Sequence, residues 1–293
     1  MSPSAIEAIR RALAEDVGDG DITSEAFIPA GHRADARIVA KENLVLAGTE
    51  AAVEVFRLVD PAINVALHNS AGARLAPGDV VLTAGGPTRS LLAAERTALN
   101  FLQQLSGIAT LTRLFVDAVK GTNVAILDTR KTTPGLREFE RAAVVAGGGI
   151  NHRFGLFDQI LAKDNHLAVT GDAEGLQAAI DRAKSKKPDV AVEVEADTLE
   201  QVRTLGALRG VNIILLDNMT LDQLREAVRI RGSKKILLEA SGGVNLQTVR
   251  AIAETGVDCI SVGALTHSAR AVDLSMEITG QGPAVRPASP AWT

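Results

Sequence analysis

Basic side chains gather in one stretch of the chain, Ile126–Leu167. An apolar run there ends in Asp128-Thr129-Arg130-Lys131, and Asn151-His152-Arg153 and Lys163-Asp164-Asn165-His166 follow further on. Guanidinium and ammonium groups are suited to binding carboxylates and phosphates. Because like charges around one pocket repel each other, Arg130, Arg153 and Lys163 are best explained by a ligand that carries more than one negative charge.

A simpler interpretation of this stretch stays open. The cations could be solvated surface groups paired with Asp158 or Glu138, and His152 could satisfy a hydrogen bond in the core. The sequence alone does not decide between a pocket and a surface.

Two acidic residues, Glu195 and Asp217, follow apolar runs that are one repeat apart. Their carboxylates could bind Mg²⁺ or accept hydrogen bonds from ribose hydroxyls. They could also form salt bridges with the cations described above. Glu193 lies two residues before Glu195 and points to the same side of the expected strand, so its role is hard to separate from that of its neighbour.

Glycines occur at two later positions that suit phosphate binding. Ser241-Gly242-Gly243-Val244-Asn245 is expected to lead into a helix, and Gly263 ends the apolar run after it. Glycines let backbone N–H groups approach a phosphate, and a helix N-terminus favours its charge. The late loops of (β/α) barrels are the usual place for such a site.

The elements that must position these residues are short apolar runs alternating with helical segments. Six such runs are found: Val124–Leu127, Gln159–Ala162, Val190–Val194, Ile213–Leu216, Ile236–Leu238 and Ile260–Val262. Repeated βα units with continuous apolar strands indicate a parallel sheet that is buried on both faces. Each run is followed by a polar residue or glycine, as expected where the carboxyl ends of barrel strands meet. Because a full barrel has eight strands, six runs suggest an incomplete one.

The chain before Gly121 has a different character. Strand-like segments over residues 34–86 alternate with turns and one helix, which predicts a small sheet with flanking helices. A helix is expected over Ser90–Ser106, broken by Gly107, with a second helix running to Lys120.

Composition narrows the classes of function. The chain has 293 residues and a net charge of −4, which argues against nucleic acid or an anionic membrane as the main partner. One cysteine, Cys259, excludes an intrachain disulfide and is expected to be a buried apolar residue. The residues 1–16 are amphipathic and charged, unlike a signal peptide, and we find no membrane span. A cytoplasmic location is therefore expected. The proline-containing tail Gly280–Thr293 is expected to be disordered and Trp292 to carry no function.

A cationic pocket, a phosphate-binding loop and a carboxylate pair together suggest chemistry on a phosphorylated sugar. When pyrophosphate is displaced from an anomeric carbon, the transition state resembles an oxocarbenium ion. A protein then has to hold both reactants and stabilise the departing pyrophosphate.

The motifs resemble those of the quinolinate phosphoribosyltransferase family, also called nicotinate-nucleotide pyrophosphorylase (carboxylating). The resemblance runs from about Glu15 to Ile278, and the motifs that carry it are Asp16–Thr23, Glu95–Asn100, Asp128–Thr132 with Pro134–Arg137, Gly147–Arg153, Lys163–His166, Val192–Glu195, Leu216–Asn218, Ser241–Gly243 and Val262–His267.

This resemblance implies a Mg²⁺-dependent reaction of quinolinate with phosphoribosyl pyrophosphate that yields nicotinate mononucleotide, pyrophosphate and CO2 in NAD biosynthesis. By similarity, the quinolinate carboxylates would be held by Arg130, His152, Arg153 and Lys163, with Arg96 reaching in from the other subunit of a homodimer. The phosphoribosyl donor would be bound by Lys131, Glu195, Asp217, Ser241, Gly242, Gly263 and His267, with Gly243 in the same loop. Catalysis would depend on Arg130, Lys131, Lys163, Glu195 and Asp217, with Glu195 and Asp217 near the metal.

The resemblance also implies an α/β fold. We expect an N-terminal α/β sandwich domain at residues 1–110, with residues 270–293 returning to it, and an open, incomplete (β/α) barrel at residues 111–269.

Two other readings compete. One is a relative of the same fold that serves molybdate uptake, although that group departs from the motifs at Asp128–Arg137 and Lys163–His166 that this chain keeps. The other is a phosphate-binding barrel isomerase or anion-binding protein, which leaves Arg130, Arg153 and Lys163 together unexplained.

Overall fold

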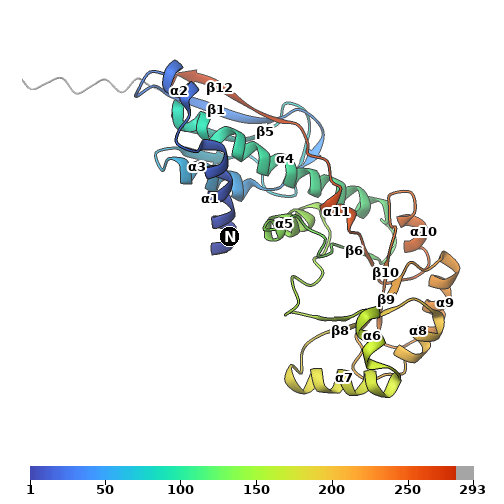
Figure 1. Ribbon diagram of the computed structural model, residues 1–293. Helices are drawn as coiled ribbons and strands as arrows, with labels where there is room; N and C mark the ends of the chain where they lie inside the picture. The colour runs from blue at the N-terminus through green and yellow to red at the C-terminus, as the bar shows by residue number, and fades with distance from the viewer. Residues whose placement is uncertain (282–293) are drawn as a thin grey trace, which may run out of the picture. The chain divides into compact units, whose positions relative to one another are not determined.

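The computed structural model describes residues 1–281, which form two compact units (Figure 1). Among the described residues, unit 1 comprises residues 1–110, 133–147 and 269–281, and unit 2 comprises residues 111–132 and 148–268. Gly280 and Gln281, expected to be disordered, are the last residues of a strand, whereas Trp292 lies outside the described residues.

Unit 1 is built on an antiparallel sheet with the strand order β12-β1-β5-β3. Its strands are β12 (Leu274–Gln281), β1 (Arg33–Ala40), β5 (Val80–Pro87) and β3 (Asn64–Leu67). Ala34, Ala36 and Ile38 alternate inward along β1, as a half-buried strand requires. The last strand, β12, pairs with β1 along its length, so the C-terminal segment returns to the first sheet (Figure 1).

Helices complete unit 1. They are α1 (Pro3–Val17), α2 (Ile22–Phe27), α3 (Thr49–Val59), α4 (Thr88–Ala118, whose last turns belong to unit 2) and α5 (Arg137–Gly147), and a small pair of strands, β2 (Leu44–Val45) and β4 (Arg74–Leu75), lies beside them. Figure 1 shows α1, α3 and α4 on one side of the sheet. A sheet with helices on one face agrees with the expected sandwich.

The expected break at Gly107 was wrong, because α4 runs without interruption from Thr88 to Ala118. One glycine inside a helix costs only about 1 kcal/mol, and long apolar flanks outweigh that cost. A Cβ at Gly107 would lie 2.0 Å from the carbonyl oxygen of Arg270. This glycine therefore permits the chain before β12 to cross the helix closely.

The segment 133–147 belongs to unit 1, although the expected boundaries put it in the barrel. The reason is the packing of α5: the ring of Phe139 lies 5.2 Å from that of Phe101 on α4, and the carboxylate of Glu138 accepts a hydrogen bond from the backbone N–H of Ser2. These contacts join residues that are far apart in the sequence, so periodicity could not reveal them.

Unit 2 contains a parallel sheet of six strands in the order β6-β11-β10-β9-β8-β7. The strands are β6 (Ala125–Leu127), β7 (Ile160–Ala162), β8 (Val192–Ala196), β9 (Ile213–Asp217), β10 (Leu237–Ser241) and β11 (Cys259–Ser261). All six apolar runs thus became strands, and the expected open, incomplete barrel is confirmed.

The helices of unit 2 connect these strands. They are α6 (Asp164–Thr170), α7 (Ala173–Lys186), α8 (Leu199–Leu205), α9 (Leu221–Arg231), α10 (Val249–Ala253) and α11 (Ala264–His267). Figure 1 shows α8 and α9 packed outside the strands. The carboxyl ends of the strands are therefore left to form the site.

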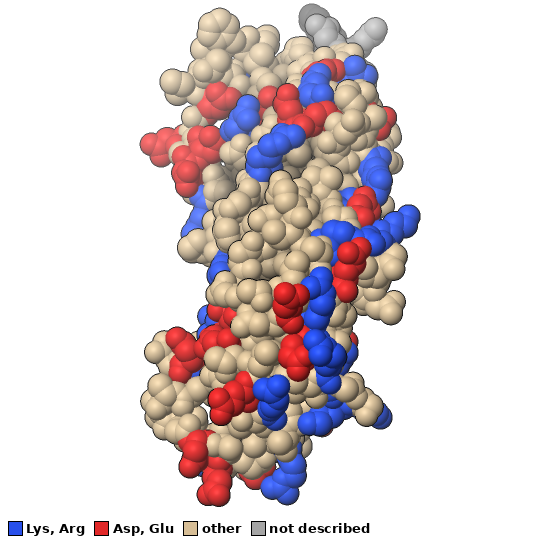
Figure 2. Space-filling model, turned by 90° about the vertical axis from the view of Figure 1, so that its right-hand side faces the viewer, with Lys and Arg blue, Asp and Glu red and all other residues tan. Residues whose placement is uncertain are grey.

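Among residues 1–281, no helix is long and apolar enough to cross a membrane. The face drawn in Figure 2 carries Lys and Arg side chains interspersed with Asp and Glu. Such mixing is unlike the extended positive field that attracts nucleic acid.

Candidate active site

A pocket of about 470 Å³ opens at the carboxyl ends of the parallel strands, and all the residues that line it belong to unit 2. Nine of the predicted site residues line it: Arg130, Lys131, His152, Arg153, Lys163, Asp217, Ser241, Gly242 and Gly243. Thr129, Leu161, Leu215, Asn218, Glu239 and Ser261 complete the lining. The fold thus brings together residues that are spread from position 129 to position 261.

Arg130 and Arg153 repel each other at this pocket. The pKa of Arg153 is lowered, first by burial and then by the positive charge of Arg130, while the carboxylates of Glu193 and Asp158 oppose this effect. A dianionic ligand between the two guanidinium groups would relieve the repulsion. The geometry therefore favours the polyanion interpretation over solvated surface residues.

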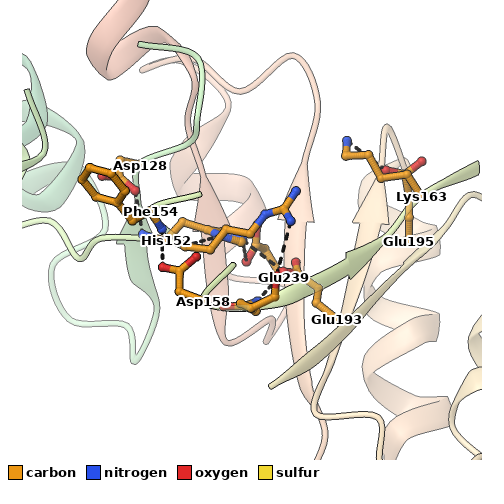
Figure 3. A network of polar contacts seen from close by, with 10 residues as sticks. Asp128, His152, Phe154, Asp158, Lys163, Glu193, Glu195 and Glu239 are labelled. Atoms are coloured by element: carbon orange, nitrogen blue, oxygen red, sulfur yellow. Dashed lines mark hydrogen bonds and ion pairs between the residues drawn. The ribbon is translucent and has the colours of Figure 1, made fainter. Parts of the chain in front are cut away.

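Lys163 and Glu195 form an ion pair in which the ammonium nitrogen lies 3.2 Å from a carboxylate oxygen (Figure 3). The side chain of Lys163 is half exposed, whereas that of Glu195 is nearly buried at the end of β8. Glu195 thus forms the salt bridge that was the alternative interpretation of the acidic pair. An exposed lysine remains able to turn toward an incoming anion.

Three carboxylates form a cluster beside this pair. One oxygen from each of Glu195, Asp197 and Asp217 lies within 4.8 Å of the others. Asp217 is oriented by Asn218, whose amide donates a hydrogen bond of 2.7 Å to it. Clustered carboxylate oxygens are the donor set that Mg²⁺ prefers, so these residues fit a magnesium ion.

The loop Ser241-Gly242-Gly243 has a backbone that requires glycine. Gly242 and Gly243 have φ values of +96° and +61°, and a Cβ at Gly242 would lie 2.1 Å from the side-chain oxygen of Asn218. The helix that was expected to follow at once begins only at Val249, because residues 244–248 form a turn around Asn245. Backbone N–H groups of the glycines, rather than a helix N-terminus, are therefore the donors available there.

Lys131, Gly263 and His267 pack together at the neighbouring loop. A Cβ at Gly263 would lie 3.0 Å from Cδ of Lys131 and 3.2 Å from Nε2 of His267. The hydroxyl of Thr266 donates to the backbone carbonyl of Lys131 at 2.7 Å, which ties the two loops. Gly263 and His267 do not line the pocket itself but support Lys131, which does.

A buried group of polar residues lies beneath the cations (Figure 3). Nε2 of His152 is 3.1 Å from Glu193 and 3.4 Å from Glu239, and both carboxylates are almost fully buried. Burial lowers the pKa of His152, but the hydrogen bonds and charges of the two carboxylates outweigh burial and raise it. Burial likewise raises the pKa of Glu193.

The backbone around His152 is fixed on both sides. The N–H of His152 donates to the fully buried carboxylate of Asp128 at 2.6 Å, and the N–H of Arg153 points at Nδ1 of the His152 ring at 2.7 Å. Glu193 also accepts a hydrogen bond of 2.7 Å from the amide of Gln159. His152 is therefore satisfied within unit 2, as its simpler interpretation held, and it also lines the pocket.

Cys259 is not a candidate nucleophile. Burial and the nearby charges of Glu239 and Asp258 raise the pKa of its thiol to about 12, so the thiolate is scarce at neutral pH. The residue is half-buried rather than fully buried as expected.

Arg96 is not part of this pocket. It lies exposed on α4 in unit 1, whereas every lining residue belongs to unit 2. Its assigned role in the site stays a prediction.

Sequence reasoning missed Glu239, Asp197 and Asn218. Glu239 lies two residues before Ser241 on β10, so strand alternation places both side chains on one side, as for Glu193 and Glu195 on β8. The same alternation, applied to β10, could have found it. Asn218 lies in the motif Leu216–Asn218, but its φ of +52° and its contact with Asp217 depend on the turn after β9.

Two family models match the chain in succession. The N-terminal domain of quinolinate phosphoribosyl transferase matches residues 21–106, and its C-terminal domain matches residues 108–277. The chain belongs to the quinolinate phosphoribosyl transferase family. The resemblance carried by the motifs is thereby confirmed, and the chain is a phosphoribosyltransferase enzyme.

Curated relatives and solved structures agree with this family. The chain is 43% identical to a probable nicotinate-nucleotide pyrophosphorylase (carboxylating) of Bacillus subtilis, covering 90% of each chain. It is 43% identical to the corresponding protein of Mycobacterium leprae, covering 94% of this chain and 97% of that one. The structure of nicotinate-nucleotide pyrophosphorylase from Francisella tularensis matches with a TM-score of 0.87 and 37% identity over 95% of this chain and 98% of that one.

Proposed function

We propose that this quinolinate phosphoribosyl transferase family member transfers the phosphoribosyl group of phosphoribosyl pyrophosphate to quinolinate with decarboxylation. The products are nicotinate mononucleotide, pyrophosphate and CO2, which is a step of NAD biosynthesis. The observation that carries the proposal is one pocket of unit 2, lined by Arg130, Arg153 and Lys163 together with Asp217 of the acidic cluster and the Ser241–Gly243 loop. It supplies groups for a dicarboxylate, a phosphate and a ribose at once.

Different residues of the pocket bind the two substrates. Arg130, Arg153 and Lys163 bind the two carboxylates of quinolinate, and their fixed positions hold the ring nitrogen toward the anomeric carbon. Lys131 and the glycine N–H groups bind phosphate oxygens of the donor and stabilise the departing pyrophosphate. Because Lys163 is paired with Glu195, a bound quinolinate carboxylate would share this ammonium group with Glu195 or replace it.

We propose Mg²⁺ as the metal of this reaction, held by Glu195 and Asp217, with Asp197 close to both. When bound, the ion neutralises negative charge on the donor pyrophosphate. Glu195 and Asp217 would otherwise repel that pyrophosphate, so the ion and the carboxylates support each other.

We also propose a homodimer, with Arg96 of one copy acting at the pocket of the other, and a cytoplasmic location. Arg96 is exposed on α4 and is therefore accessible to a second copy. The single cysteine is compatible with a reducing compartment.

The experiment that tests the function follows release of CO2 and nicotinate mononucleotide from quinolinate and phosphoribosyl pyrophosphate, with and without a chelator. We expect turnover that chelation abolishes and Mg²⁺ restores. Asp217→Asn should lower turnover by roughly 100-fold or more, because the carboxylate acts on developing charge. The control is Asp222→Asn on α9, an almost fully exposed acid whose loss should leave turnover unchanged.

A folded protein without turnover would contradict the proposal. In that case a thermal-shift titration separates the remaining readings, because a ligand raises the melting temperature of the state that binds it. Stabilisation by molybdate would favour the molybdate-linked relative, and stabilisation by a simple sugar phosphate would favour an anion-binding barrel.

A further inference from the structure

The imidazole of His152 has both nitrogens directed at the protein. Nδ1 lies 2.7 Å from the backbone N–H of Arg153, while Nε2 faces Glu193 and Glu239 at 3.1 Å and 3.4 Å. The N–H of Arg153 that points at Nδ1 requires a lone pair there. Despite burial, the two carboxylates raise the pKa of His152, but a second ring proton on Nδ1 would point directly at this N–H. The ring therefore carries one proton, on Nε2, which faces the carboxylates. With its lone pair used in this way, the ring is not arranged to bind a metal through Nε2.

The two carboxylates lie deeper than the residues that meet the ligand. Glu193 precedes Glu195 by two residues on β8, and Glu239 precedes Ser241 by two residues on β10. Because strand residues alternate between faces, each glutamate lies on the pocket side but further from the strand end. In Figure 3 both point toward the ring of His152.

Burying these carboxylates is costly, and little else in unit 2 offsets the cost. The side chains of Glu193 and Glu239 are 0% and 1% exposed. Glu193 has Gln159 as a second partner. Among the described residues, Glu239 has the contact of 3.4 Å with Nε2 of His152 but no hydrogen bond of good geometry to either oxygen. Buried carboxylates normally need full pairing, so a role confined to packing would be served better by an apolar side chain.

We propose that Glu239, together with Glu193, is a positioning residue of the quinolinate site. The two carboxylates hold the ring of His152 by Nε2, and the ring in turn holds the backbone of Arg153 by Nδ1. Arg153, which lines the pocket together with Arg130, then extends from a backbone whose position is fixed. This inference rests on the proposed function, since it assumes that Arg153 binds a quinolinate carboxylate.

The role is specific for one substrate. Arg153 lies with Arg130 on the quinolinate side, whereas the donor is assigned to Lys131 and the glycine loops. If the backbone of Arg153 is no longer held by His152, quinolinate binding should therefore weaken, whereas the binding of phosphoribosyl pyrophosphate should remain almost unchanged. A general loss of packing would weaken both.

The first test uses the unaltered protein and needs no activity. With ¹⁵N-labelled histidine, NMR at neutral pH should show His152 protonated at Nε2 and unprotonated at Nδ1, with the signal assigned by its absence from His152→Asn. Protonation at Nδ1 would overturn the proposal, because the contact to the N–H of Arg153 could not then exist.

The second test compares Glu239→Leu with Glu239→Gln by calorimetric titration of quinolinate and of phosphoribosyl pyrophosphate. Loss of a group that orients a site residue typically costs roughly 10- to 100-fold, and we expect this increase in the Kd of quinolinate for Glu239→Leu. Glu239→Gln keeps an oxygen that can accept the Nε2 proton and should recover most of the affinity. An unchanged Kd in folded Glu239→Leu, or an equal loss for both ligands, would overturn the proposal.

The two tests also separate this inference from the proposed function. If the unaltered protein does not bind quinolinate, the proposed function fails, and the NMR measurement still decides whether the carboxylates hold the ring. If Glu239→Leu does not fold, Glu239→Gln and the NMR measurement carry the decision.

Discussion

Charged side chains serve different purposes where β12 meets the first sheet of unit 1 and at the pocket of unit 2. In unit 1, Arg37 on β1 and Lys41 just after β1 both pair with Glu277 on β12, at 2.9 Å and 2.8 Å, and Arg270 pairs with Glu42. These exposed pairs lie where the returning strand meets the first sheet, and water screens them. In unit 2, cations converge on a pocket, and the acidic partners are mostly buried beneath it. The pairs of opposite charge at β12 stabilise the fold, whereas the cations clustered at the pocket are placed to bind an anionic ligand.

Arg96 is the proposed exception to this comparison, because it lies in unit 1 but is proposed to bind substrate at the pocket of a second copy. Arg96→Ala should reduce turnover by roughly 100-fold or more, because it removes a donor that acts on an anionic substrate. Mixing Arg96→Ala with Lys163→Ala should restore part of the activity, because some mixed dimers then contain one intact site. The measurement is nicotinate mononucleotide formation after subunit exchange.

The matched control is Arg37→Ala, which removes an exposed unit 1 arginine paired with Glu277 and should leave turnover unchanged. If the mixture gains no activity although subunits exchange, Arg96 does not act across a dimer. If Arg96→Ala is fully active, Arg96 has no role at the pocket, and the proposed substrate-binding cations all lie in unit 2.

The two units also use glycine differently. Gly107 in unit 1 makes room for the chain at Arg270, whereas Gly242 in unit 2 allows the backbone conformation of a loop at the site. Gly107→Ala should destabilise the protein by about 1–3 kcal/mol, because its Cβ would overlap the carbonyl of Arg270. Urea unfolding followed by circular dichroism measures this change. Gly280→Ala on β12 is the control, because a Cβ there meets nothing within 4 Å and should change stability little.

The smallest expected effect concerns the surface pair Glu42–Arg270. The hydrogen bond from Arg270 lowers the pKa of Glu42 from 4.5 to about 2 in the folded protein. A lowered pKa means that the pair contributes stability above pH 4.5 and loses it as the pH falls toward 2. Unfolding of Glu42→Gln and of the unaltered protein should therefore differ at neutral pH and converge in acid. A constant difference at every pH would show that the charge of Glu42 is not what matters.

Much of unit 2 could be predicted because its signals are local. Each apolar run, such as Ile213–Leu216, is long enough and β-branched enough to mark a strand, and the polar residue after it marks the strand end. The parallel arrangement then follows from the helical segments between the runs. Nine of the predicted site residues line one pocket for this reason.

The expectations that differ from the structure concern places where contacts between distant residues decide. Gly107 has the local signature of a helix end, but the flanks of α4 pack against other elements and the glycine makes room for Arg270. The segment 133–147 continues the motif stretch in sequence, yet Phe139 packs on Phe101 and places α5 in unit 1.

The sequence by itself determined the family, the six strands and the chemical types at the strand ends, because periodicity and motif spacing are properties of neighbouring residues. Only the tertiary structure decided that Glu239 and Glu193 face one imidazole and that Asn218, which donates to Asp217, lies against Gly242. The physical reason is that the environment of a polar side chain depends on residues from other strands. Whether a carboxylate meets water, a metal or a histidine is settled only when those strands are packed side by side.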